Sequence, residues 1–452
     1  MNDFKKTLKK LLKYIDINSN RKIAIKTMIV AGLFTIIVRI FGFLKESIIA
    51  NYFGVSKYVD FYLLSLVFAT FFVIPIGGSL GVLLTKSYIK LNDKISQISA
   101  ANIYVKCQFL GVILISFLGL IQAGLLTYKP VQIWIENRFD GLSETHALFL
   151  LPICLFCSIS IINRSILAAR EKFTTHALLP IFVPITILIF LLISPQQYLF
   201  EALFLGTVFG FFFEFVIGGI FLKQVILDIN FKKNDNQTNE LKKIINSAPS
   251  MFLSSIIMSG CLIVDQIMSV LAGDGALAMI NYGNRVPLGV ISIIAIVWTV
   301  LYPSFIKDAS ENNFTALKKN ISYYCMLSLL LLFPFLGIFS LFSQDVITFL
   351  FQRGAFVSSD TLIVSDIQTL YLLHIPLYVI SMICVRVLNT LEKTNIILLG
   401  NILLLILNIA FNLYFIEEYG VIGVPLATLV SYSIIAILWF ISTHKQIKTI
   451  IK

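Results

Sequence analysis

The chain has 452 residues, of which 58% are hydrophobic and 13% are charged, and its formal net charge is +11. Soluble domains contain about half apolar and a quarter charged residues. The composition therefore excludes a soluble enzyme, a disordered chain and a nucleic-acid-binding domain. A mean hydropathy of +0.90 means more apolar surface than a water-exposed fold can bury. These values indicate a polytopic membrane protein.

Twelve apolar segments follow one another along the chain, each long enough to cross a hydrocarbon layer about 30 Å thick. They cover residues 27–50, 60–86, 102–126, 146–168, 176–194, 198–222, 247–272, 276–306, 318–342, 360–388, 395–415 and 420–443. The basic residues alternate from loop to loop, and 28 of the 35 Lys and Arg fall on one side of this arrangement. By the positive-inside rule that side is cytoplasmic, so both termini are predicted to be cytoplasmic.

The two halves of the chain are similar at an offset of 221 residues, which places Glu171-Lys172 over Glu392-Lys393. Six spans per half is an even number, so both halves have the same orientation and are related by an axis along the membrane normal. The predicted fold is all-α, with two six-helix lobes at 27–222 and 247–443 joined by a cytoplasmic loop at 223–246. Residues 1–26 form a predicted basic amphipathic segment on the anionic inner leaflet, and residues 444–452 form a basic tail.

Several charged residues fall within or beside the predicted spans, where a charge is costly and normally faces a cavity. They are Arg39, Lys45 and Glu46 in the first span, Asp60 at the start of the second and Arg285 in the eighth. Guanidinium groups bind phosphate oxygens through paired hydrogen bonds, so these residues predict a cationic cavity between the lobes that holds an anion. The alternative interpretation is that Lys45 and Asp60 are interfacial residues that reach the headgroups.

A second polar cluster is predicted in the C-terminal lobe. It contains Asp265 in the seventh span, Asn408 and Asn412 in the eleventh, and Val424 and Thr428 in the twelfth. Residues four apart lie on the same helix face, and the oxygens of these groups are suitable ligands for Na⁺, with protonation of Asp265 as the alternative. Hydrogen bonding between helices is another interpretation of the Asn and Thr residues. Glu214, in the sixth span, has no partner that the sequence identifies.

Three segments resemble the MurJ/MviN family, the lipid II flippases of the MOP superfamily. RIFGFLKESIIANYFGVSKYVDFYLLS (Arg39–Ser65) is similar to the first two helices of that family, and NYGNRVPLGVISI (Asn281–Ile293) to its eighth helix. LFQRGAFVSSDT (Leu350–Thr361) is similar to the periplasmic segment before its tenth helix. The resemblance extends along nearly the whole chain.

The resemblance implies a substrate site at Arg39, Lys45, Glu46, Asp60 and Arg285, and an Na⁺ site at Asp265, Asn408, Asn412, Val424 and Thr428. Some of these positions differ from the family pattern. Lys45 and Glu46 stand where the family has an Arg-Asp pair, and Asn412 replaces a carboxylate. Val73 and Leu288 stand where well-studied members carry an arginine and a glutamate.

The expected function is translocation of an undecaprenyl-diphosphate-linked glycan such as lipid II to the periplasmic leaflet of the bacterial inner membrane, by ion- or potential-driven alternating access. A Wzx-type flippase for an O-antigen or capsule unit is the open alternative. A MATE-type antiporter predicts an acidic cavity, and a membrane glycan polymerase needs a large external loop, so both fit less well. We expect a monomeric transporter without catalytic residues or a cofactor, with Na⁺ or H⁺ as the candidate coupling ion. Its expected partners are the lipid-linked glycan and the anionic bilayer.

Overall fold

The structure is a computed structural model that describes residues 19–94, 97–139, 142–223, 225, 235–292, 294, 326, 329–330, 332–391 and 393–451. All regular elements of these residues are helical, which confirms the predicted all-α class. The predicted amphipathic segment at 1–26 lies outside the residues whose side chains are described.

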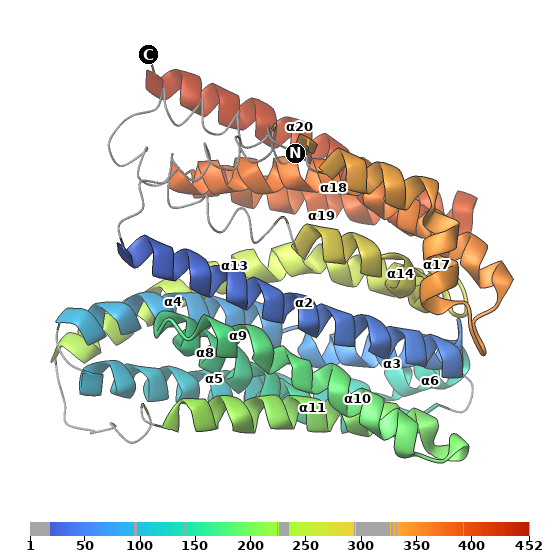
Figure 1. The fold of residues 1–452 in the computed structure, drawn as a ribbon, viewed down its shortest axis with the longest axis horizontal. Helices are drawn as coiled ribbons and strands as arrows, with labels where there is room; N and C mark the ends of the chain where they lie inside the picture. The colour runs from blue at the N-terminus through green and yellow to red at the C-terminus, as the bar shows by residue number, and fades with distance from the viewer. Residues whose placement is uncertain are drawn as a thin grey trace.

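The helices group by half of the chain (Figure 1): α2 to α11 lie in the lower part of the view, α17 to α20 in the upper part, and α13 and α14 between them. The first half contains α2 (Ser19–Phe53), α3 (Lys57–Thr70), α4 (Val73–Lys94), α5 (Gln97–Leu126), α6 (Lys129–Phe139), α7 (Glu144–Phe149), α8 (Pro152–Ala169), α9 (Phe173–Leu178), η1 (Leu179–Ile181), α10 (Phe182–Ile193), η2 (Gln196–Tyr198) and α11 (Leu199–Phe221). The second half contains α13 (Asp235–Ala272), α14 (Ala276–Gly283), α17 (Ser343–Phe351), α18 (Ser358–Thr390), α19 (Thr394–Tyr419), η3 (Gly420–Ile422) and α20 (Gly423–Ile451).

Eight helical segments of the described residues are long and apolar enough to cross a membrane. A ninth is added if Leu332–Leu341 and Ser343–Phe351, which meet at 74°, form one broken span. One of the eight, Asn395–Ile447, covers both predicted spans at 395–415 and 420–443. The predicted eighth and ninth spans run into residues outside the described ranges, so the count of twelve and the division into two six-helix lobes stay predictions.

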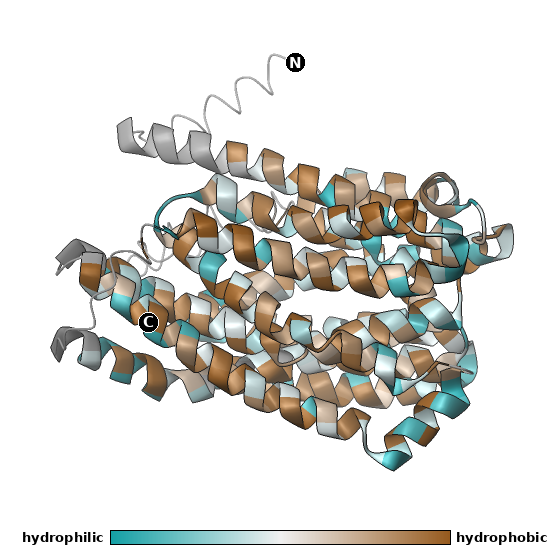
Figure 2. Cartoon of the chain, turned by 90° about the horizontal axis from the view of Figure 1, so that it is seen from below, coloured by the Kyte–Doolittle hydropathy of each residue, from teal (hydrophilic) through white to brown (hydrophobic). Residues whose placement is uncertain are grey.

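The outer surface of the helices is apolar. Leu120 is 73% exposed and Leu341 is 83% exposed, which a water-facing surface would rarely show for such large side chains. Figure 2 shows hydrophobic residues along the lengths of the helices and hydrophilic residues collected toward their ends and connections. The chain is therefore a polytopic membrane protein.

Small residues let α11 approach α10 closely. A Cβ atom added to Gly206 would lie 2.8 Å from Cα of Ile187, and one added to Gly210 would lie 2.6 Å from Cα of Val183. Such small residues four apart are typical of helix packing in membranes, where close backbone contact replaces the hydrophobic effect. Glu214 follows at the same spacing, and this packing therefore places its carboxylate on the buried side of α11.

The two halves meet through backbone contacts at one end of the molecule. The amide of Ala355 donates to the carbonyl of Asn51 at 2.9 Å, and the hydroxyl of Tyr282 donates to the carbonyl of Gly54 at 3.2 Å. Gly354 has φ of +57°, and a Cβ there would lie 2.3 Å from the oxygen of Asn51. Only glycine accepts both this conformation and this approach. The segment before α18 thus closes on the end of α2, about one and a half to two turns beyond Glu46.

Candidate functional site

A cavity of about 780 Å³ lies beside α2. The residues that line it are Gly32, Thr35, Val38, Arg39, Gly42, Lys45, Glu46, Thr70, Ile74, Cys157, Ile161, Arg164, Phe173, His176, Ala177, Pro180, Val183, Pro184, Phe211, Glu214 and Arg285. The sequence predicted a cavity between two lobes. Within the described ranges the first half supplies most of the wall, and Arg285 is the one contribution from the second half.

Lys45, Glu46, Asn281 and Arg285 form a charged group on one wall of the cavity, which we call the Glu46 cluster. The Glu46 carboxylate is 1% exposed and lies 2.8 Å from Nζ of Lys45. It also pairs with Nη2 of Arg285 and accepts a 3.3 Å hydrogen bond from Nδ2 of Asn281. Arg285 donates back to Oδ1 of Asn281 at 2.8 Å. One buried carboxylate therefore pairs with two cations from different halves of the chain, and the cluster keeps one net positive charge.

Arg39 lies on α2 about two turns before Glu46. Its Nη2 donates to the hydroxyl of Ser292 at 2.8 Å, in the helical segment that follows α14. No carboxylate of the described residues pairs with Arg39. Its charge therefore remains available to an anion in the cavity.

Asp60 does not line the cavity, although the sequence grouped it with Arg39 and Arg285. The side chain is 1% exposed, and its Oδ1 accepts a 2.7 Å hydrogen bond from the backbone amide of Ala278. Ala278 is in the first turn of α14, whose free amides favour a negative group. Asp60 thus joins α3 to the start of α14 and is not part of the cavity lining.

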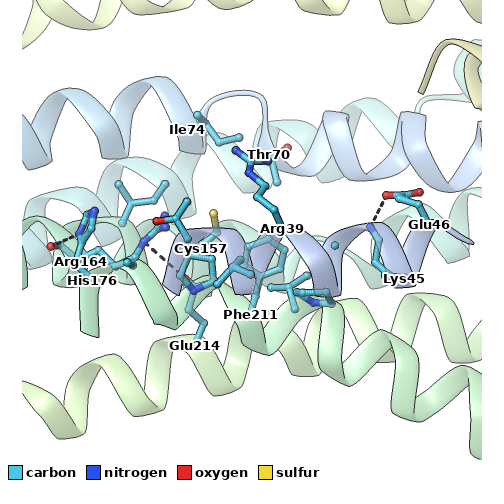
Figure 3. A pocket seen from close by; sticks show the side chains of 18 of the residues that line it. Arg39, Lys45, Glu46, Thr70, Ile74, Cys157, Arg164, His176, Phe211 and Glu214 are labelled. Atoms are coloured by element: carbon cyan, nitrogen blue, oxygen red, sulfur yellow. Dashed lines mark hydrogen bonds and ion pairs between the residues drawn. The ribbon is translucent and has the colours of Figure 1, made fainter. Parts of the chain in front are cut away.

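Arg164 and Glu214 are cavity residues that the sequence did not assign. Nε of Arg164 lies 3.3 Å from Oε1 of Glu214, which also accepts a 2.6 Å hydrogen bond from the hydroxyl of Ser160. Nδ1 of His176 donates to the carbonyl of Arg164 at 2.9 Å. We call Ser160, Arg164, His176 and Glu214 the Arg164 cluster (Figure 3).

The sequence held one signal for Arg164. It lies inside the predicted fourth span at 146–168, and the mostly apolar residues Ser165–Ala169 that follow it continue the helix for more than a turn. The partner of Glu214 could not be found in the same way, because 50 residues separate the two side chains.

The lining contains four cationic side chains, Arg39, Lys45, Arg164 and Arg285, and two acidic ones, Glu46 and Glu214. The described wall is therefore positive overall. In a low-dielectric cavity such an excess attracts an anion strongly.

The predicted cluster in the second half comes together as a hydrogen-bonded group. Nδ2 of Asn408 and Nδ2 of Asn412 each donate to Oδ1 of Asp265 at 2.9 Å, and the hydroxyl of Thr428 donates to Oδ2 at 2.9 Å. Thr428 also lies 3.2 Å from the carbonyl of Val424. We call Asp265, Asn408, Asn412 and Thr428 the Asp265 cluster; it joins α13, α19 and α20.

The Asp265 cluster contains a buried negative charge with neutral partners. Asp265 is 8% exposed and both asparagines are fully buried, and no Lys or Arg of the described residues pairs with the carboxylate. Oδ1 of Asn408 and Oδ1 of Asn412 are buried without a hydrogen-bond partner. Two unpartnered amide oxygens beside an uncompensated carboxylate fit a hard cation such as Na⁺.

Sequence comparison finds relatives along nearly the whole chain. A family model described as "Lipid II flippase MurJ" matches residues 49–452. The "Lipid II flippase MurJ" of Thermosipho africanus is 26% identical over 435 residues, which cover 92% of this chain and 85% of that protein. A Buchnera aphidicola protein named "Probable lipid II flippase MurJ" is 26% identical over 432 residues, which cover 89% of this chain and 80% of that protein.

Structural comparison finds the same fold in two groups of transporters. A lipid II flippase MurJ in an inward closed conformation has a TM-score of 0.71 at 23% identity, covering 93% of this chain and 90% of that one. An inward-facing multidrug resistance transporter of the MATE family has a TM-score of 0.75 at 14% identity, covering 94% of this chain and 98% of that one. The fold is thus that of the MOP superfamily. Because the family model spans nearly the whole sequence, the chain belongs to the lipid II flippase MurJ family.

Proposed function

We propose that this protein is a transporter, not an enzyme, which moves an undecaprenyl-diphosphate-linked glycan, lipid II in the first place, from the cytoplasmic to the periplasmic leaflet. The observation that supports this most is the cavity wall with four cationic and two acidic side chains. A diphosphate linking a lipid to a sugar has two negative charges, which balance that excess. Relatives named lipid II flippases over most of the chain support the same substrate class.

In this proposal Arg39 and Arg285 bind the diphosphate. Among the described residues Arg39 has a hydroxyl partner only, so it can turn to a phosphate oxygen without leaving a carboxylate unpaired. Arg285 pairs with Glu46. When the Arg285 guanidinium moves to the substrate, Glu46 still pairs with Lys45, so its buried charge stays compensated. Glu46 therefore neutralises the empty site and exchanges partners when the anion enters.

The proposal places the protein in the bacterial inner membrane as a monomer with both termini cytoplasmic. The lipid tail stays in the bilayer while the headgroup crosses through the cavity. One half rocks against the other, and the backbone contacts between Asn51 and Ala355 close one end in the present state. Alternating access of this kind is typical of transporters built from repeated halves.

We further propose that the Asp265 cluster couples transport to a cation gradient. One charge that crosses a potential of 100 mV contributes about 2.3 kcal/mol, and Asp265 is the one carboxylate in the cluster that can carry it. Na⁺ is the first choice because of the two unpartnered amide oxygens. A proton on Asp265 is the alternative.

Transport by purified protein in liposomes tests the cation site. Arg285→Ala and Arg39→Ala should each abolish flipping of the fluorescent lipid-linked glycan at normal protein level. Lys129→Ala, which removes an exposed cation outside the cavity, is the control and should be fully active. Normal flipping by both arginine variants would refute the anion cavity.

The coupling ion is tested in the same liposomes. A Na⁺ gradient at fixed pH should accelerate flipping by the parent, whereas a pH gradient at equal Na⁺ should not. Asp265→Asn should remove the response to the Na⁺ gradient. If the response of this variant equals that of the parent, the Asp265 cluster only connects helices.

A third experiment identifies the glycan. Flipping is compared between lipid II and an O-antigen or capsule unit on the same lipid carrier, and the glycan that is flipped is the substrate.

A further inference from the structure

The Arg164 cluster lies at the opposite end of the cavity from Lys45 and Glu46, with Arg39 between them (Figure 3). The helix α9, which carries His176, packs against α2, which carries Arg39 and Lys45. Arg39 and Lys45 alone are about 9 Å apart along the helix. If a diphosphate is bound near Arg39 and Arg285, Arg164 is therefore placed to contact a different part of the same substrate.

The geometry of the Arg164–Glu214 pair leaves most of the guanidinium unused. Nε lies 3.3 Å from the carboxylate, and its N–H is not aligned for a hydrogen bond. No acceptor among the described residues pairs with the two terminal nitrogens of Arg164. The side chain of Arg164 is 27% exposed while that of Glu214 is 4% exposed. The free face of the guanidinium is thus presented to the cavity that it lines.

Glu214 is oriented to hold Arg164 in place. Its Oε1 receives the hydroxyl of Ser160, one turn before Arg164 on the same helix. His176 fixes the backbone carbonyl of Arg164 and so fixes the end of α8 against α9. A buried carboxylate without a cation would be costly, so Glu214 holds the Arg164 guanidinium at the cavity wall. The two terminal nitrogens of Arg164 are not used in this contact.

We propose that Arg164 is a specificity-determining residue that binds a carboxylate on the glycan headgroup, at a subsite separate from the diphosphate site. A planar guanidinium with two free terminal nitrogens matches a carboxylate through paired hydrogen bonds. The inference rests on the proposed function, since the headgroup reaches Arg164 only if the diphosphate is bound near Arg39.

Binding of two matched lipids to the full-length protein in nanodiscs tests the subsite. One is lipid II with free headgroup carboxylates, and the other is the same lipid with these carboxylates converted to methylamides. The second lipid lacks the negative charge and the second acceptor oxygen of each carboxylate, so the parent should bind the first at least about tenfold more tightly. The double variant Arg164→Gln/Glu214→Gln keeps a neutral, similarly sized pair and should bind both lipids with the affinity of the amidated one.

The outcomes separate this inference from the proposed function. Equal affinity of the parent for the two lipids would overturn the carboxylate subsite and leave the flippase proposal standing. A preference that survives in the double variant would assign the carboxylate to another residue. Equal weakening of both lipids in the double variant would show that Arg164 is structural only. If the parent binds neither lipid, the proposed function fails and the subsite fails with it.

Discussion

The Glu46 cluster and the Asp265 cluster both have a buried carboxylate, but their partners differ. Glu46 lies between Lys45 and Arg285, so its charge is cancelled by more than one cation. Asp265 receives two amide groups and one hydroxyl, all neutral. The Glu46 cluster therefore has a net positive charge and suits an anion. The Asp265 cluster has a net negative charge and suits a cation. The same group thus has opposite roles because of its neighbours.

The largest expected effect concerns Glu46→Gln. This change leaves Lys45 and Arg285 close together without the buried carboxylate that compensates them. Removing one member of a buried ion pair costs about 3–5 kcal/mol, so the variant should unfold at a clearly lower temperature in detergent. Adding Lys45→Met should recover part of the loss. An unchanged unfolding temperature would mean that solvent already screens the Glu46 cluster.

Asp265→Asn should remove stabilisation by Na⁺. A ligand at one hundred times its dissociation constant stabilises the folded state by about 2.7 kcal/mol. The parent should therefore gain thermal stability when NaCl replaces choline chloride at equal ionic strength, and the variant should gain none. Glu46→Gln serves as the control here, because its carboxylate lies in the other cluster and its Na⁺ response should be normal. A Na⁺ response that persists in Asp265→Asn would contradict the comparison.

Asn412→Asp should sharpen the difference between the clusters. The new carboxylate lies beside Asp265, where Nδ2 of Asn412 now donates at 2.9 Å, and like charges repel unless a cation joins them. The variant should be less stable without Na⁺ and bind Na⁺ about tenfold more tightly, a gain of about 1.4 kcal/mol. The measurement is thermal stability as a function of Na⁺ concentration. Weaker Na⁺ binding would show that the amide oxygen of Asn412 is needed as a ligand.

Asn281→Ala has the smallest expected effect. It removes a 3.3 Å hydrogen bond to Glu46 and a 2.8 Å hydrogen bond from Arg285 but leaves the ion pair. Net losses for such bonds are about 1 kcal/mol. Flipping should slow only a few-fold, far less than in Arg285→Ala. A complete loss of flipping would mean that the orientation of Arg285, rather than its charge, limits substrate binding.

The sequence predicted the members of both clusters to different degrees. Asn408 and Asn412 are four residues apart, so the helical repeat alone puts them on one face, and a mid-span Asp265 needs polar neighbours. The structure joins them directly. Lys45 and Glu46 are adjacent in the sequence. The sequence predicted that they share a cavity with Arg285, but it did not predict their direct contact. Asp60 could not be placed, because a carboxylate that meets backbone amides leaves no pattern in the sequence.

The sequence by itself determined the properties that depend on composition and on the helical period. These are a polytopic all-α membrane protein and an excess of cations at membrane depth. These properties follow from the cost of apolar surface in water and of charge in lipid. Tertiary structure alone decided which charges face each other. Arg164 meets Glu214 because α8, which carries the arginine, packs against α11, which carries the glutamate. Such a contact depends on the crossing of separate helices, which local spacing does not encode.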